Sequence, residues 1–321
     1  MTHPSHCHLL VARLPAPEAS IGTLPALRRL LSRGRLQQIP LAAEHALCQV
    51  FGLNPPQQDW PLAPLALLGE GVDPGASVWM RVGPVHYQLQ RDSFSLDLPQ
   101  PPLAPEDAGQ LVADLNRHFE GRGMVFTAPH PQRWYLRLAQ APALRTYPLS
   151  QALGRDVGRC APEGEDAAAW RSIVNEAQML LHDHPVNRRR EAAGQLSVNS
   201  LWPEGAGVLP ETLGRRFERV WSDLVLVRGL ARLSGSDCRP VVEVFQQPSG
   251  SGDDLLVLAP TAWEPLEAEM LQPMLEGLRT GRWASLTLDF GGREGVLRCQ
   301  IRRQDLWKFW RRPVSLEGCF G

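Results

Sequence analysis

The sequence predicts an α/β fold: a largely parallel sheet flanked by helices, with a smaller α+β domain inserted into it. Two observations favour this class. Short apolar runs alternate with amphipathic helical stretches towards both ends of the 321-residue chain, as in parallel sheets covered by helices. Between them lies a block of alternating, strand-like sequence bounded by proline and glycine. We therefore expect a core in two parts, 1–72 and 166–321, and an inserted domain at 73–165.

The first part of the core is predicted to begin with a buried strand at His8–Leu14 ("HLLVARL"), an apolar run after a polar start. Two helices should follow, over Leu24–Arg35 and Ala42–Leu53. Apolar residues recur there at helical spacing, and a glycine stands near the end of each stretch. The glycines of Leu65–Gly75 ("LALLGEGVDPG") predict a loop.

The inserted domain is predicted to have a ββαβ-type order. Ser77–Leu98 alternates apolar and polar residues, which indicates two strands. Ala104–Gly123 is typical of an amphipathic helix, with acids early and a glycine at its end. Met124–Gln140 returns to strand-like sequence, and 141–166, rich in proline, glycine and charge, is expected to be the exit linker.

The second part of the core should open with a long helix from Asp166 that Pro185 ends or bends. "PEGAG" (203–207) predicts a glycine loop. The remaining expected elements are a helix, strand and helix within 213–235, strands within 253–260 and 284–290 flanking a helix over 263–281, and a last strand before an aromatic and basic run within 295–313.

The composition bounds the classes of function. A net charge of −1 provides no global field to recruit nucleic acid or an anionic membrane. No stretch approaches the roughly 18 consecutive apolar residues of a membrane span, and Met1–Leu14 lacks the features of a signal peptide. Six scattered cysteines without a C-x-x-C pair indicate reduced thiols. We expect a soluble, cytoplasmic protein without a membrane partner.

Residues 184–202 ("HPVNRRREAAGQLSVNSLW"), followed by "EGAG", resemble a signature of the archaeal-type, cofactor-independent phosphoglycerate mutases, members of the alkaline-phosphatase superfamily. "LVLVRGLARLSG" (224–235) also resembles a strand–RG–helix segment of that family. "RWYLRL", "HDHPVN" and "FWRRP" are similar to proteobacterial regulatory proteins of the RpfE type. The resemblance implies an alkaline-phosphatase-like core. For the mutases it implies two divalent metals and a serine that is phosphorylated in passing.

The metal ligands that this resemblance implies are missing from the matching positions. Arg13 and Leu14 stand where an Asp-Gly pair would end the first strand, and the late loop "LLVLAPTAWEP" has no histidine. An Asp-His pair becomes Asp289-Phe290, and no histidine follows His184. We therefore predict no metal cofactor, with Asp289 as a remnant ligand. We expect a catalytically degenerate protein that acts in regulation, through an unknown protein partner or an anionic, phosphorylated small molecule.

Two other functions remain open at this point. The first is a working metal-dependent phosphoglycerate mutase or phosphohydrolase with two Mn, Mg or Zn ions, its rearranged ligands drawn from His86, His182, Asp183, His184 and Asp289. The second, least favoured, is association with nucleic acid through the C-terminal tryptophans and arginines. The neutral net charge argues against it.

Two groups of residues are candidate binding sites. Guanidinium–phosphate geometry favours an anion site in the polar stretch and the RG segment, made of His182, His184, Asn187, Arg188, Arg190, Asn199 and Arg228. A helix end with polar caps is the alternative for the two histidines. Three adjacent arginines cannot all face one site, so at least one should face solvent or pair with an acid. A partner is expected to dock on Trp307, Trp310, Arg311 and Arg312, with both tryptophans on one side of a helix.

Overall fold

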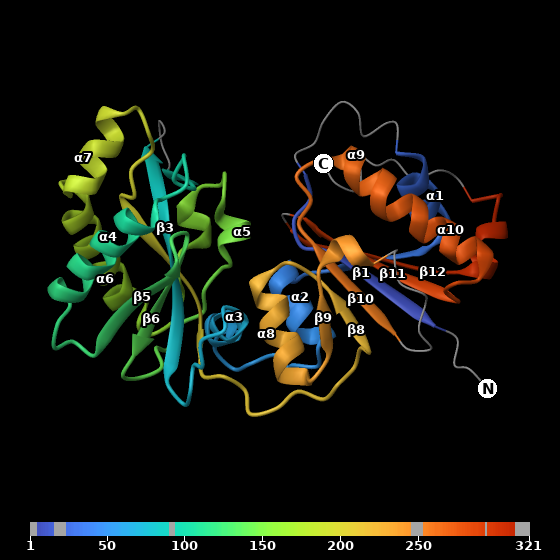
Figure 1. Cartoon of the computed structure of the whole chain (residues 1–321), viewed down its shortest axis with the longest axis horizontal. Coiled ribbons are helices and arrows are strands. Elements are labelled where there is room, and N and C mark those ends of the chain that lie inside the picture. Colours follow the sequence, from blue (N-terminus) through green and yellow to red (C-terminus); the bar gives the residue numbers. More distant parts are fainter. Residues whose placement is uncertain (1–4, 16–23, 90–93, 245–252, 293, 312–321) are drawn as a thin grey trace. The chain divides into compact units, whose positions relative to one another are not determined.

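A computed structural model describes residues 5–15, 24–89, 94–244, 253–292 and 294–311 (Figure 1). Contacts divide the chain into two compact units. Unit 1 comprises Met1–Asn54 and Thr212–Gly321, and unit 2 comprises Pro55–Glu211. Unit 1 is thus drawn from both ends of the chain and unit 2 from its middle.

A seven-stranded sheet forms the centre of unit 1. Five neighbouring strands pair in parallel, β12 pairs antiparallel with the last of them, and β2 in turn pairs antiparallel with β12. In spatial order the strands are β2 (Arg35–Ile39), β12 (Gly295–Arg302), β11 (Ser285–Gly292), β1 (His6–Val11), β10 (Asp254–Leu258), β8 (Arg219–Trp221) and β9 (Asp237–Arg239). The predicted α/β class is therefore confirmed for this unit.

Helices cover both faces of this sheet (Figure 1). On one face lie α2 (Ala43–Val50) and α8 (Val225–Ser234); on the other lie α1 (Pro25–Arg33), α9 (Trp263–Pro265), the π-helix η4 (Leu266–Leu271) and α10 (Gln272–Thr280). The buried carboxylate of Glu267 accepts the backbone N–H groups of Ala26 and Leu27, at 2.6 and 3.1 Å. These are donors of the first turn of α1 that have no partner within the helix.

Strand alternation places the polar residues of this sheet on one face. Cys7, Leu9 and Val11 join the hydrophobic core on the side of α1 and α10. His8 therefore points to the opposite side, where α2 packs. Asp289 on β11 stands beside Leu10 in the register and shares that face with His8.

Unit 2 is built on an antiparallel sheet. Its strands are β4 (Phe94–Asp97), β3 (Val78–Leu89), β6 (Arg133–Leu138) and β5 (Met124–His130) in that order, with β7 (Ser200–Gly207) paired to β3. One face is covered by α4 (Pro105–His118), α6 (Ala167–His182) and α7 (Pro185–Ala192); α3 (Leu62–Gly69) and α5 (Leu149–Ala152) lie on the other side (Figure 1). A large buried cluster between sheet and helices includes Trp134, Leu136 and Leu181.

Two stretches that were predicted as loops form regular structure instead. Unit 2 therefore extends beyond the inserted domain that was predicted at 73–165. The first half of Leu65–Gly75 belongs to α3, whose apolar residues are buried. Residues 203–207 continue β7, where Gly205 adopts a φ of +64° and passes close to Leu62. A Cβ at Gly205 would lie 2.5 Å from the Cβ of Leu62. Glycine here permits a close approach within a strand and does not mark a loop.

Other predicted elements were also wrong or missed. The expected linker 141–166 carries α5 and the 3-10 helix η2 (Val157–Cys160), and its residues pack with Val85 and Trp202. No helix precedes β8 within 213–218, and β2 and β9 were not predicted. Short strands such as these carry too few residues to show a period.

No helix among the described residues is long and apolar enough to cross a membrane. Five cysteines in the described part of the chain are free thiols: Cys7, Cys48, Cys160, Cys238 and Cys299. This agrees with the unpaired cysteines that the sequence predicts.

Candidate functional site

A buried carboxylate occupies the middle of the sheet of unit 1. Asp289 on β11 is 0% exposed. From β12, Arg298 donates its Nε to Oδ1 of Asp289 at 2.7 Å and its Nη2 to Oδ2 at 2.6 Å. From β1, the Nε2 of His8 lies 2.9 Å from Oδ2. Both oxygens of Asp289 are thus engaged, one by Arg298 alone and one by Arg298 and His8, in a fork geometry that gives strong charge-assisted hydrogen bonds.

The pairing of neighbouring strands brings the triad of His8, Asp289 and Arg298 together. Asp289 and Arg298 stand directly opposite each other on antiparallel neighbours, and Leu10, two residues after His8, stands beside Asp289 on the parallel neighbour. Burial alone would raise the pKa of Asp289, but hydrogen bonds from Arg298 and His8 outweigh it and hold that pKa below its usual value. The carboxylate therefore stays ionised and paired at neutral pH.

Apolar rings lie beside the triad. The ring of Phe217 contacts His8 edge-on, with centroids 6.4 Å apart, and contacts Phe51 in the same way at 5.8 Å. Low polarity around an ion pair strengthens the attraction between its partners but makes any unpaired charge costly. The environment favours a neutralised pair over an open carboxylate.

The side chains present do not fit a site for two divalent cations in unit 1. Such ions need several oxygen or nitrogen ligands, but the oxygens of Asp289 already face a guanidinium group, which repels a cation. Arg13, where the family resemblance implies an acid, follows β1 and is exposed. Within the described ranges no group of three or more His, Cys, Asp or Glu is placed to hold a metal ion.

The rearranged ligands of the alternative enzyme are divided between the two units. Asp289 belongs to unit 1, whereas His86, His182, Asp183 and His184 belong to unit 2. The Nδ1 of His86 lies 3.0 Å from a backbone carbonyl, and His182 and Asp183 are exposed at the end of α6. That the chain binds no metal cofactor stays a prediction from the sequence.

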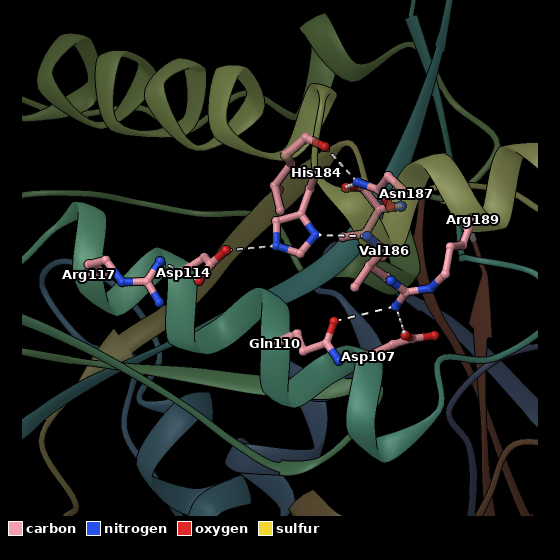
Figure 2. A network of polar contacts seen from close by, with 10 residues as sticks. Asp107, Gln110, Asp114, Arg117, His184, Val186, Asn187 and Arg189 are labelled. Carbon is pink, nitrogen blue, oxygen red and sulfur yellow. Dashed lines mark hydrogen bonds and ion pairs between the residues drawn. The ribbon is translucent and has the colours of Figure 1, made fainter.

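In unit 2 His184 ties the start of α7 to α4 (Figure 2). As the N-cap of α7, its Nδ1 accepts the backbone N–H of Val186 at 3.2 Å. Its Nε2 lies 3.0 Å from Oδ2 of Asp114, whose other oxygen pairs with Arg117 at 2.7 Å. His184 is 5% exposed, so the capping alternative describes its local role.

Asn187 joins α7 to the two segments on either side of it. It is fully buried, and its Nδ2 donates to the carbonyls of Leu181 and Val198, both at 2.7 Å. Its Oδ1 accepts the N–H of Val198 at 2.9 Å. Both N–H donors and the oxygen of the Asn187 amide are therefore hydrogen-bonded to backbone groups, and neither donor is directed to a ligand.

The three consecutive arginines point in three directions. Arg190 is 4% exposed and donates to two backbone carbonyls, at 2.8 and 2.6 Å. Arg189 pairs with Asp107 at 2.9 Å, as Figure 2 shows, and the exposed Arg188 lies 3.5 Å from Asp183. The expectation that at least one of them pairs with an acid is confirmed.

The two remaining members of the predicted anion site, Asn199 and Arg228, belong to different units. Asn199 exchanges two hydrogen bonds with the backbone of Tyr87, at 2.7 and 2.9 Å. Arg228 belongs to α8 of unit 1, where its Nε is buried without a hydrogen-bond partner in the described part of the chain. An anion at this site would have to compete with backbone carbonyls for the donors of Asn187, Arg190 and Asn199. Anion binding by these residues stays a prediction.

The C-terminal aromatic segment is exposed, with Trp307, Phe309 and Trp310 at 77%, 79% and 68%. The 3-10 helix η5 (Arg303–Trp307) ends at the first tryptophan, and Trp310 lies in a turn. The prediction that both tryptophans share one side of a helix was therefore wrong, because the 3-10 helix ends before it reaches Trp310.

Arg311 anchors this segment to α1. Its Nη1 donates to the carbonyls of Arg33 and Gly34, at 3.1 and 2.7 Å, and Arg33 in turn donates to the carbonyl of Lys308. These carbonyls at the end of α1 lack partners within the helix and favour a cation. Arg312 lies outside the described residues.

Sequence reasoning missed the partners of Asp289 and two pockets of unit 1. A pocket of about 470 Å³ lies at the carboxyl ends of β8 and β10, where open parallel sheets commonly bind ligands. Most of its lining is apolar, including Val242, Leu258 and Met270, with carboxylates from Asp223 and Glu269. The second pocket lies at the opposite end of the sheet. Residues from distant segments line both pockets, so no local motif marks them.

Comparison with known proteins identifies the relatives of this chain. The family described as 2,3-bisphosphoglycerate-independent phosphoglycerate mutase matches residues 33–187. A mutase of that name from Archaeoglobus fulgidus is 35% identical over 98 residues, 27% of this chain and 24% of the relative. One from Methanopyrus kandleri is 38% identical over 96 residues, 26% of this chain and 23% of the relative. The chain is related to this mutase family. The matches span about a quarter of the length of these curated relatives.

The solved structure of the PH0037 protein from Pyrococcus horikoshii has the same fold, with a TM-score of 0.52 at 16% identity. It covers 94% of this chain and 88% of that protein. The likeness in fold therefore extends over both units. The match to the mutase family ends at Asn187 and includes neither His8, Asp289 nor Arg298.

Proposed function

We propose that this chain is a catalytically degenerate relative of the phosphoglycerate mutases that acts as a regulatory protein in the cytoplasm. It works by binding a protein partner or a phosphorylated small molecule, and it uses no metal cofactor. It is a bacterial protein of the RpfE type, which the segments "RWYLRL", "HDHPVN" and "FWRRP" support. The unpaired cysteines support a reducing compartment.

The ion pair between Asp289 and Arg298 carries the proposal. A carboxylate that binds a catalytic cation must direct oxygen lone pairs to it, and both oxygens of Asp289 accept from Arg298. Breaking such a pair exposes an uncompensated buried charge, so Arg298 is not easily displaced. The guanidinium of Arg298 supplies the positive charge that stabilises the carboxylate. Unlike a metal ion, it has no vacant coordination position at which a substrate could bind.

The alternative is an active metal-dependent phosphoglycerate mutase or phosphohydrolase. It is supported by the sequence similarity to proteins from Archaeoglobus fulgidus and Methanopyrus kandleri that are both described as mutases. This function would require ligands other than a free Asp289.

Metal analysis and an activity assay on the same protein separate the two functions. We expect the full chain, loaded with Mn²⁺, Mg²⁺ or Zn²⁺ and then dialysed, to retain no stoichiometric metal. We also expect no interconversion of 2- and 3-phosphoglycerate. Two retained metal equivalents together with turnover would establish the enzyme. Asp289→Asn is the matched variant, because a trace activity that it leaves unchanged comes from a contaminant or from another site.

The exposed aromatic segment supports partner binding. Trp307, Phe309 and Trp310 lie on the surface of unit 1, and tryptophan is enriched at the centres of protein interfaces. We expect a partner captured by the wild type to be lost with Trp307→Ala/Trp310→Ala and retained with Arg171→Gln, a change on the exposed face of α6. Equal capture by all three proteins would remove this surface from the proposal.

A further inference from the structure

A pocket of about 970 Å³ lies in unit 1 at the amino end of β11. It is bordered by the end of α10, by η5 and by the outer face of α1. Four arginines from these separate segments line it, together with one buried and one exposed tryptophan: Arg29, Arg279, Arg302, Arg303, Trp283 and Trp307. It lies at the opposite end of the sheet from the carboxyl ends of the parallel strands, where ligands of this fold class usually bind.

The positive charge of this pocket is largely uncompensated. Arg279 pairs with Glu276 at 3.4 Å, but no described carboxylate forms an ion pair with Arg29, Arg302 or Arg303. Like charges that outnumber the nearby acids repel one another and raise the free energy of the fold. An anion would relieve this repulsion and use the planar donor groups of the arginines.

Arg303 is positioned by the turn that ends α10. Gly281 adopts a left-handed conformation there, with a φ of +86°. A Cβ at this glycine would lie 3.1 Å from Nη1 of Arg303, so the guanidinium packs over the bare backbone. Arg303 therefore lies against this turn, although all four arginines of the pocket are exposed.

A buried donor without an acceptor also lines the pocket. Trp283 is 1% exposed, and its indole N–H has no hydrogen-bond partner among the described residues. The opposite edge of the ring, at Cζ3 and Cε3, contacts Gly277. A buried N–H without a partner is costly, and an oxyanion that entered from the pocket and reached it would be a suitable acceptor.

We propose that this pocket binds a nucleotide, with its phosphates among the arginines and its base against Trp307. The exposed indole of Trp307, 77% accessible, offers a flat face at the rim of the arginine cluster. Bases stack on such rings whatever their identity, while guanidinium groups hold phosphate oxygens in pairs. The inference does not depend on whether the chain is an enzyme, since the triad of His8, Asp289 and Arg298 is not part of the pocket lining.

Isothermal titration of the full chain with ADP, pyrophosphate and adenosine tests each half of the site. We expect ADP to bind most tightly, pyrophosphate more weakly, and adenosine least. Removing one charge-assisted donor with Arg303→Gln should weaken ADP binding about tenfold. Trp307→Ala should weaken binding of ADP but leave pyrophosphate unchanged, because only the base contacts the ring.

Matched variants make the result decisive. Arg171→Gln removes an equal charge from an exposed helix of unit 2 and should leave ADP binding unchanged. Trp283→Phe keeps an aromatic side chain, although a smaller one, and removes the N–H; it should weaken binding of both ADP and pyrophosphate. Absence of ADP binding would overturn the proposal, as would equal weakening by Arg303→Gln and Arg171→Gln. Binding of single-stranded RNA without any binding of ADP would also overturn it.

Discussion

Two sets of buried polar residues, one in each unit, have different kinds of partner. In the sheet of unit 1, Asp289 forms an ion pair with Arg298. In unit 2 the polar residues of the family-like stretch are caps and connectors: His184 caps α7 and Asn187 bonds the backbone on both sides of it. Asp289 is held by a side chain of opposite charge, whereas His184 and Asn187 bond to other parts of unit 2.

The similarity to the mutases concerns mainly one of the two units. The family match over residues 33–187 covers most of unit 2 and excludes the triad of unit 1. His184 and Asn187, which lie within the matched range, are bonded to other parts of unit 2. The match therefore includes polar residues that hold unit 2 together and none of the triad of unit 1.

The largest effect is expected from Arg298→Met, which tests the ion pair of unit 1. It leaves Asp289 buried without a partner and should lower the free energy of unfolding by about 3–5 kcal/mol. The lower end is expected, because Arg298 is 25% exposed. Urea unfolding, with hydrogen exchange of peptides from β11, measures the loss and locates it.

The double variant Arg298→Met/Asp289→Leu is the control for that experiment. Replacing both partners removes the unpaired charge, so most of the lost stability should return. If the single variant is as stable as the wild type, the pair does not hold Asp289 and the contrast between the units fails.

The counterpart in unit 2 is Asn187→Leu. It has a similar volume but leaves the N–H of Val198 and the carbonyls of Leu181 and Val198 without partners. We expect a loss of about 3 kcal/mol, seen as faster hydrogen exchange in α7 and around Val198. Arg188→Ala, on the exposed face of the same helix, should change stability by less than about 0.5 kcal/mol. Equal effects of the two changes would contradict the connecting role of Asn187.

A pH dependence is expected from Asp59 of unit 2. Burial raises its pKa to about 6, although hydrogen bonds from Thr146 and the N–H of Trp60 oppose the shift. An unfolded aspartate titrates near pH 4, so between about pH 4 and 6 the folded protein holds a proton that the unfolded chain has released. The stability contributed by Asp59 is present below about pH 4 and is lost as pH rises through about 6.

We expect Asp59→Asn to remove a decline of about 2–3 kcal/mol over that interval. Carboxylates with lowered pKa values, such as Asp289 and Glu70, act in the opposite direction, so the test is the difference between variant and wild type. Parallel curves of unfolding free energy against pH would show that Asp59 is ionised in the folded protein.

The smallest effect is expected from His184→Ala, which removes the cap of α7. The cost should be about 1–2 kcal/mol, the range of a lost N-cap with one further contact. His182→Ala, two residues earlier and exposed, is the matched control and should be neutral. A larger effect at His182 than at His184 would favour a role for His182 in binding.

The positions of most helices and strands could be predicted from the sequence, but the contacts of the candidate functional side chains could not. Helices α1, α2 and α4 and strands β1, β3, β10 and β11 were predicted close to their positions, because their apolar periods are long enough to be recognised. β7 was predicted as a loop because its glycines suggested a turn. Only the contact of Gly205 with Leu62 shows why a strand needs a glycine there.

The sequence by itself determined the fold class and the relation to the mutases. Each of these depends on residue identity and local spacing. Tertiary structure decided that Arg298 occupies both oxygens of Asp289, that Asn187, Arg190 and Asn199 donate to backbone carbonyls, and that four arginines line one pocket with Trp283. Strand register and helix packing bring together residues as far apart as Arg29 and Arg303, and no local pattern in the chain records that meeting.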